Sequence, residues 1–97
     1  MLESTTYRMH GRVVLRRIGE DRLLVPVSGG VARENCVFPI NATGEFIWAG
    51  LTKGGTLDET AAAVAAEFAV APEDARRDCR EFAERLLAHG LIEAGAP

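Results

Sequence analysis

Long hydrophobic runs and paired cysteines are both missing from this chain of 97 residues. No apolar stretch approaches the roughly 20 residues that span a bilayer, and the first residues contain no apolar segment of the kind found in signal peptides. The two cysteines, Cys36 and Cys79, lie far apart in apolar segments and form no CxxC motif. We therefore expect a soluble, cytoplasmic protein with reduced thiols in its core.

A strong charge of either sign is also missing. The formal net charge is −3 and the isoelectric point is about 5.3. Nucleic-acid binding rests largely on basic residues that neutralise phosphates, so this balance argues against a nucleic-acid partner. Hydrophobic residues make up 47% of the chain, which is enough for a compact core. We expect residues 1–97 to form one domain, with residues 1–10 as a flexible tail.

No group of residues has the spacing of a catalytic or metal site. Metal ligands are normally clustered in sequence or on one element, but His10, Cys36, Cys79 and His89 are nowhere closer than ten residues. The acidic residues between 73 and 84 alternate with arginines, a pattern typical of a solvated helix face. The sequence thus predicts a protein that is not an enzyme and that holds neither metal nor cofactor.

Three short strands are predicted in the first part of the chain. Residues 12–18 and 23–27 are rich in β-branched residues and flank a turn, which predicts a β-hairpin. Residues 36–40 predict a third strand. Pro26 and Pro39 lack a backbone N–H, so each must lie where the sheet needs no donor.

The first predicted helix begins directly after the third strand. Asn41 is a preferred N-cap residue, since its side chain can accept hydrogen bonds from the first turn. The helix should extend from residue 42 to about residue 51. Phe46, Ile47, Trp48 and Leu51 project from several sides of it. A short helix that is apolar around much of its circumference is buried, so we expect it to be central to the core.

Two more helices follow. Thr56 and Glu59 have the spacing of a capping box and begin a helix that ends near Ala69. Pro72 suits the first position of a third helix, and Gly90 suits its C-terminal cap. Strands followed by helices indicate an α+β domain. We expect a winged helix-turn-helix-like fold, with a three-stranded antiparallel sheet followed by three helices.

One flank of the third helix has two interpretations. The apolar stripe predicted for this helix contains Ala75, Cys79, Phe82 and Leu86. On a helical wheel with Ala75 at zero, four other residues fall between about 80° and 140°, beside this stripe: Arg76, Arg80, Ala83 and Leu87. They could be the edge of the core with solvated arginines. They could also be one wall of a groove for an extended, partly acidic peptide. An open edge of the third strand would form the other wall and accept the peptide as an added strand.

Three motifs carry a family resemblance. They are INATGEFIW at residues 40–48, TLDE at 56–59, and a segment from the PE pair at 72–73 through Asp78, Phe82 and Leu86 to GLI at 90–92. Together they resemble the PqqD family, whose name refers to pyrroloquinoline quinone synthesis. The resemblance covers about residues 12–93.

The resemblance implies a winged helix-turn-helix adaptor, not a catalyst. In such recognition elements the leader of a ribosomally made precursor peptide adds to the third strand and lies against the third helix. The adaptor presents the peptide to a modifying enzyme, often a radical S-adenosylmethionine enzyme. Carried onto this chain, the peptide-binding residues would be Asn35, Cys36, Val37, Phe38, Pro39 and Ile40 on the strand, and Arg76, Arg80, Ala83 and Leu87 on the helix.

Two other functions fit the same fold. One is a winged-helix DNA-binding regulator, which the acidic balance of the chain disfavours. The other is a non-catalytic subunit of a larger complex, with the sheet edge bound to a protein partner. A bare strand edge could also pair with a second copy of the chain across a two-fold axis.

Overall fold

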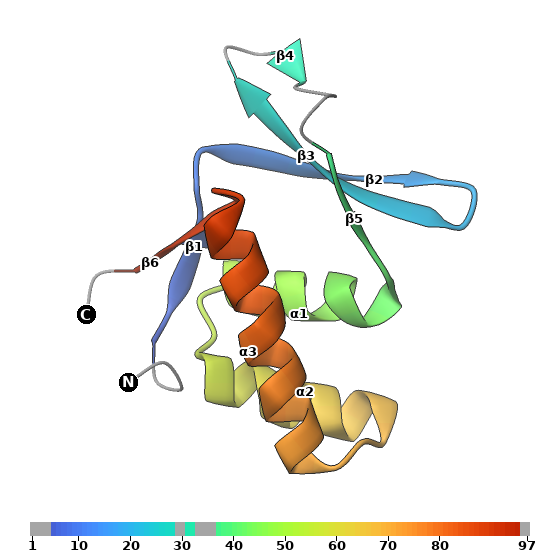
Figure 1. Ribbon diagram of the computed structural model, residues 1–97, viewed down its shortest axis with the longest axis vertical. Helices are drawn as coiled ribbons and strands as arrows, with labels where there is room; N and C mark the ends of the chain where they lie inside the picture. The colour runs from blue at the N-terminus through green and yellow to red at the C-terminus, as the bar shows by residue number, and fades with distance from the viewer. Residues whose placement is uncertain (1–4, 29–30, 33–36, 96–97) are drawn as a thin grey trace.

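The computed structural model describes residues 5–28, 31–32 and 37–95, and within them strands precede the helices and one further strand follows them (Figure 1). The fold is α+β, as predicted. The elements in chain order are β1 (Tyr7–Met9), β2 (Arg12–Ile18), β3 (Asp21–Ser28), β4 (Val31–Ala32), β5 (Phe38–Ile40), α1 (Ala42–Thr52), α2 (Leu57–Phe68), α3 (Pro72–Ala88) and β6 (Ile92–Ala94).

The predicted hairpin is formed by β2 and β3, and β3 is the central strand of its sheet. β2 and β3 pair antiparallel along their whole length and turn at Gly19, whose φ of 63° favours glycine. β5 pairs antiparallel with β3, with Phe38 opposite Leu24 and Ile40 opposite Arg22. β4 pairs with the other end of β3. The third strand, predicted over residues 36–40, is therefore confirmed for Phe38–Ile40; Val37 lies just before it, and Cys36 lies outside the described residues.

The two ends of the described chain form a small sheet that the sequence did not predict. β1 pairs antiparallel with β6, with Tyr7 opposite Ala94 and Met9 opposite Ile92. Tyr7 is buried in the core. The prediction of a flexible tail over residues 1–10 is therefore wrong for Tyr7–Met9. The tail is ordered there because β6 offers a partner strand and the core accepts the tyrosine ring.

The helices begin where their capping residues predict. The Asn41 side-chain oxygen accepts a hydrogen bond from the Gly44 N–H at 2.8 Å. Thr56 and Glu59 form the complete capping box, with donor–acceptor distances of 3.0 and 2.8 Å. α3 has no side-chain cap at Ala71 and begins with a proline. These contacts confirm the three predicted helix starts.

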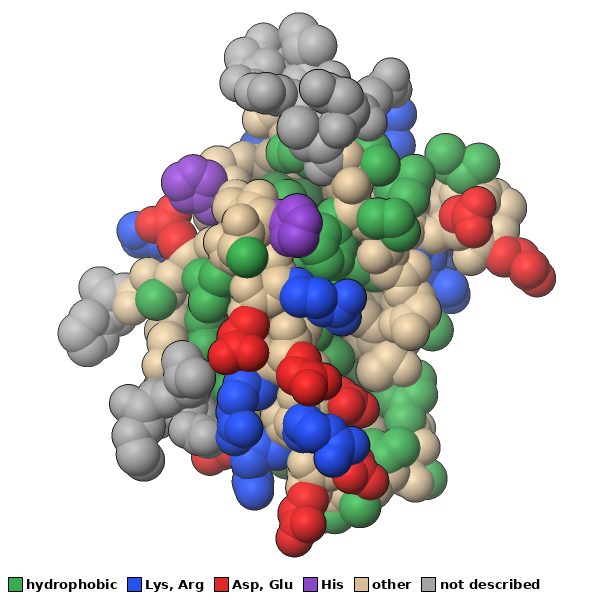
Figure 2. Space-filling view, viewed as in Figure 1, with side chains coloured by type: hydrophobic (Ala, Val, Ile, Leu, Met, Phe, Trp, Pro, Cys, Tyr) green, Lys and Arg blue, Asp and Glu red, His purple; other side chains and the backbone are tan. Residues whose placement is uncertain are grey.

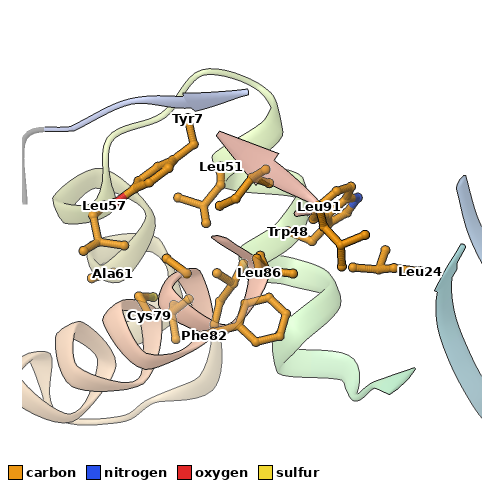
Figure 3. Close-up of a cluster of buried hydrophobic side chains, with 14 of the residues drawn as sticks. Tyr7, Leu24, Trp48, Leu51, Leu57, Ala61, Cys79, Phe82, Leu86 and Leu91 are labelled. Carbon is orange, nitrogen blue, oxygen red and sulfur yellow. The ribbon is translucent and has the colours of Figure 1, made fainter. Parts of the chain in front are cut away.

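The core lies between the sheet and the helices, with α1 at its centre. Trp48 and Leu51 of α1 are 6% and 0% exposed. Figure 3 shows them among side chains from β1, β3, α2, α3 and the segment after α3. The apolar stripe predicted for α3 is buried as expected, at Ala75, Cys79, Phe82 and Leu86. The buried helix predicted after the third strand is thus the support on which the sheet and α3 rest.

Candidate functional site

An open groove lies between β5 and α3, which run side by side in opposite directions (Figure 1). Its volume is about 850 Å³. Phe38 of β5 packs edge-on against Phe82 of α3 and against His89, the C-cap of α3, with ring-centroid distances of 6.1 and 5.0 Å. These aromatic contacts fix the spacing of the two walls at one end of the groove.

The junction between β5 and α1 forms the floor of the groove. Gly44 lies in the first turn of α1, and a Cβ added there would meet Ile40 Cβ and the Phe82 ring at 3.2 Å. Any larger side chain would push β5 and α3 apart. The Asn41 cap and Gly44 therefore set how closely the strand, the central helix and α3 approach one another.

One edge of β5 is free to take another strand. In the part of the chain that the structure describes, β5 pairs only with β3. Pro39 and Ile40 line the groove beside that edge. An unpaired edge is a template for an added β-strand, because its backbone groups need partners. The carbonyl oxygen of Pro39 can accept a hydrogen bond, but Pro39 has no backbone N–H to donate one. An added strand that faces Pro39 would therefore form one hydrogen bond fewer.

The α3 wall is mixed in charge but mainly acidic. Asp78, Glu81 and Glu84 line the groove with one arginine, Arg85. The Arg85 guanidinium lies over the Phe82 ring, 5.4 Å from its centroid. Figure 2 shows acidic and basic side chains alternating over the exposed face of α3, with hydrophobic side chains gathered toward β5. The groove thus combines an apolar base with a charged wall.

The strand residues predicted for peptide contact fall at or beside this groove where they are described. Pro39 and Ile40 line it. Phe38 is buried beneath it, and Val37 is exposed just before the strand. Asn35 and Cys36 lie outside the described residues. Contact of these residues with a peptide stays a prediction.

The helix residues predicted for peptide contact lie on the other flank of α3 and do not line the groove. Ala83 is only 2% exposed and belongs to the core, and Leu87 packs against the core. The Arg76 Nε atom lies 3.3 Å from Asp58 of α2. Arg80 is half-buried on the same flank. A peptide in contact with these four residues would need a second site outside this groove.

The sequence singled out one flank of α3 and interpreted the charged residues on the other flank only as a solvated face, so the groove residues of α3 were not predicted. On the same wheel the groove residues fall between about 180° and 340°, across the buried stripe from the predicted wall. One signal was available. Ala83 and Leu87 widen the apolar stripe to one side, which indicates packing on that side and an open surface on the other.

The tilt of the hairpin over α1 is held by an ion cluster. Glu45 of α1 hydrogen-bonds Arg17, and its other carboxylate oxygen lies 2.7 Å from Arg22 Nε. The hydrogen bond from Arg17 has the largest effect on the pKa of Glu45. Together with the bond from Arg22, it lowers this pKa from its ordinary value of 4.5. Arg22 is opposite Ile40 in the sheet, so the cluster also fixes the strand beside the groove.

Cys79 is not activated as a nucleophile, and the described residues contain no cluster of metal ligands. Burial, together with the charge of Asp78, raises the pKa of the Cys79 thiol to about 11, so it stays protonated and unreactive at neutral pH. Within residues 5–28, 31–32 and 37–95, no three His, Cys, Asp or Glu side chains gather as metal ligands. In the same residues, no helix is both long enough and apolar enough to cross a bilayer.

Comparison with known proteins places the chain in a family. The fold and groove define a small winged-helix-like domain with an open sheet edge. The family model described as "Coenzyme PQQ synthesis protein D (PqqD)" matches residues 23–92, and the chain belongs to the PqqD family. Members of this family are non-catalytic peptide-binding domains, which confirms the expectation that the chain is not an enzyme. No curated protein matched the chain.

Two solved structures are similar to the chain. TbiB1, solved in complex with the TbiA(beta) leader peptide, is 28% identical and has a TM-score of 0.70. That match covers 93% of this chain and 99% of TbiB1. Lasso peptide synthetase B1, complexed with the leader peptide, is 21% identical with a TM-score of 0.73, covering 90% of this chain and 96% of that one. The second likeness shows the fold alone.

Proposed function

We propose that this protein binds the leader segment of a ribosomally made precursor peptide and presents it to a modifying enzyme. The observation that carries the proposal is the unpaired edge of β5, which forms one wall of a groove whose other wall is α3. A leader added as a strand along β5 would gain backbone hydrogen bonds, and the groove would select its side chains. TbiB1, a similar chain over nearly its whole length, was solved with a leader peptide.

The modifying enzyme is the second partner in this proposal. A radical S-adenosylmethionine enzyme is one such partner, as the family resemblance implies. The adaptor holds the leader while the rest of the peptide reaches the enzyme. This division of labour fits a domain with an open groove in a family of non-catalytic peptide-binding domains.

The charge of α3 gives no support to DNA binding. Pro72–Ala88 contains five acidic and four basic residues. The groove wall itself carries three of the acids, Asp78, Glu81 and Glu84, and one arginine, Arg85. Phosphate binding needs the opposite balance.

The test is an amide NMR titration with leader segments of precursor peptides encoded beside the gene. Binding along β5 should shift the amides of Val37, Phe38 and Ile40 and those of the α3 residues that line the groove. Shifts confined to other surfaces, or none with any neighbouring leader, would contradict the proposal.

Two arginines on opposite flanks of α3 provide a matched pair for the same titration. Arg85→Glu changes the groove wall, whereas Arg80→Glu changes the other flank. We expect Arg85→Glu to change leader affinity about two- to tenfold and Arg80→Glu to leave it within twofold, as for exposed charges. The opposite result would move the site to the flank that the sequence predicted.

A further inference from the structure

Two opposite charges stand one helical turn apart on the α3 wall of the groove. Glu81 and Arg85 both line it. Within the described residues neither forms an ion pair, and the Arg85 guanidinium rests over the Phe82 ring instead. Both charges are therefore available to a ligand in the groove. Asp78 and Glu84 add negative charge near Glu81.

The spacing of this pair matches the repeat of a β-strand. Four residues of α-helix advance about 6 Å along the axis. Alternate residues of a strand lie about 6.6 Å apart and point to the same face. A strand lying along α3 can therefore place side chains i and i+2 opposite Glu81 and Arg85.

The direction of an added strand follows from the direction of β5. Phe38 at the start of β5 packs against His89, at the C-terminal end of α3. Ile40 at the end of β5 lies by Gly44 and Phe82, farther toward the start of α3. β5 therefore runs opposite to α3. β5 pairs antiparallel with β3, and a new strand that also paired antiparallel with β5 would run in the same direction as α3. It would pass Glu81 before Arg85.

We propose that the leader recognised here carries a basic residue followed two positions later by an acidic residue. The basic side chain pairs with Glu81, and the acidic one pairs with Arg85. This proposal rests on the proposed function and specifies the class of peptide that the groove takes. It adds a basic residue to the partly acidic peptide expected from the sequence, because most of the charge on the wall is negative.

The test is selection from a random peptide library displayed on phage. Three proteins serve as bait: the wild type, the swap Glu81→Arg with Arg85→Glu, and a control swap Asp74→Arg with Arg77→Asp. Asp74 and Arg77 form an exposed pair on the same helix, 3.0 Å apart, and do not line the groove. Each variant is first checked for a native amide spectrum. The single change Arg85→Gln replaces the swap if the swap does not fold.

The wild type and the control swap should enrich Lys or Arg followed two positions later by Asp or Glu. The groove swap should enrich the reversed order. The Arg85→Gln variant should lose only the preference for an acidic residue at the second of the two peptide positions. Each exposed pair is expected to contribute about 1.5- to fivefold to the enrichment, and high salt should reduce it.

The outcomes separate this proposal from the function it rests on. One outcome is that selected peptides shift the β5 amides but show no charge order. Another is that the wild type and the groove swap select the same order. Either outcome would overturn the proposed charge pattern and leave the proposal of leader binding intact. If no selected peptide and no neighbouring leader shifts the β5 amides, both the charge pattern and the proposal of leader binding are overturned.

Discussion

The two flanks of α3 differ both in what covers them and in the sign of their charge, since one carries Arg76 and Arg80 and the other is mainly acidic. On one flank Ala83 is buried in the core and Arg76 reaches Asp58 of α2. On the other flank Arg85 and Ala88 face an open groove beside β5. Both flanks carry arginines next to apolar residues.

The buried stripe between the flanks supports both of them. Phe82 belongs to the core, yet it also lines the groove. One side of α3 thus anchors the helix, while the side next to it is left for a ligand. Substitutions on the two flanks should therefore separate stability from binding.

The largest effect should come from removing the support shared by both flanks. Trp48→Ala leaves a cavity under the sheet and α3, because Trp48 is 6% exposed in the core. We expect the free energy of unfolding to fall by about 3–5 kcal/mol. Denaturant unfolding followed by circular dichroism measures this. An unchanged midpoint would show that the ring does not support the core.

Replacing an alanine by glutamate should destabilise the fold on one flank and leave its stability almost unchanged on the other. Ala83→Glu places a carboxylate at a site that is 2% exposed and should destabilise the fold by about 2–4 kcal/mol. Ala88→Glu places it at the exposed groove wall, so stability should change by no more than about 0.5 kcal/mol. Thermal unfolding of the two variants tests this. Equal losses of stability would remove the distinction between the flanks.

A smaller effect is expected from the ion cluster that fixes β3 beside the groove. Glu45→Gln removes the carboxylate that holds Arg17 and Arg22, at a cost of about 0.5–1 kcal/mol at neutral pH. Since folding lowers the pKa of Glu45, its contribution is present above its unfolded pKa and is lost as pH falls through the folded value.

Unfolding free energies of wild type and Glu45→Gln should therefore converge as the pH falls from neutral through the lowered pKa of Glu45. A difference independent of pH would assign the loss to packing instead of charge. Asp58→Asn, on the outer side of α2, is a suitable control because its carboxylate is exposed and remote from the hairpin.

The smallest effect should come from Arg76, at the exposed edge of the flank on which Ala83 is buried. Arg76→Ala breaks an exposed ion pair whose side chains are 47% and 53% accessible. Such pairs contribute about 0–0.5 kcal/mol, so the unfolding midpoint should hardly move. Leader affinity should not change either, because Arg76 does not line the groove. A clear loss of affinity would show that leader binding extends to this flank.

The elements with strong local signals were predictable from the sequence. The Asn41 cap and the Thr56–Glu59 capping box make the hydrogen bonds that their residue types favour. The stripe containing Cys79 and Leu86 is buried because its helical spacing demands one apolar side. These features depend on neighbours in the chain.

The elements that depend on distant partners were not predictable. β1 exists because Tyr7–Met9 meets Ile92–Ala94, and no local pattern in three residues reveals such a partner. The flank of α3 that lines the groove was not predictable for a related reason. A helical wheel shows where the buried stripe lies, but the position of β5 on one side of it is a property of the whole fold.

The pairing of β1 with β6 has a consequence for the topology of the chain. Tyr7 is opposite Ala94, and the Gly95 N–H donates to the Thr6 carbonyl oxygen at 2.8 Å. These residues lie on the side of the molecule away from β5 (Figure 1). A short linker could join the chain there, and new ends could be opened at the exposed turn around Gly54. Such a circular permutant would keep the groove unobstructed while placing both of its ends between α1 and α2.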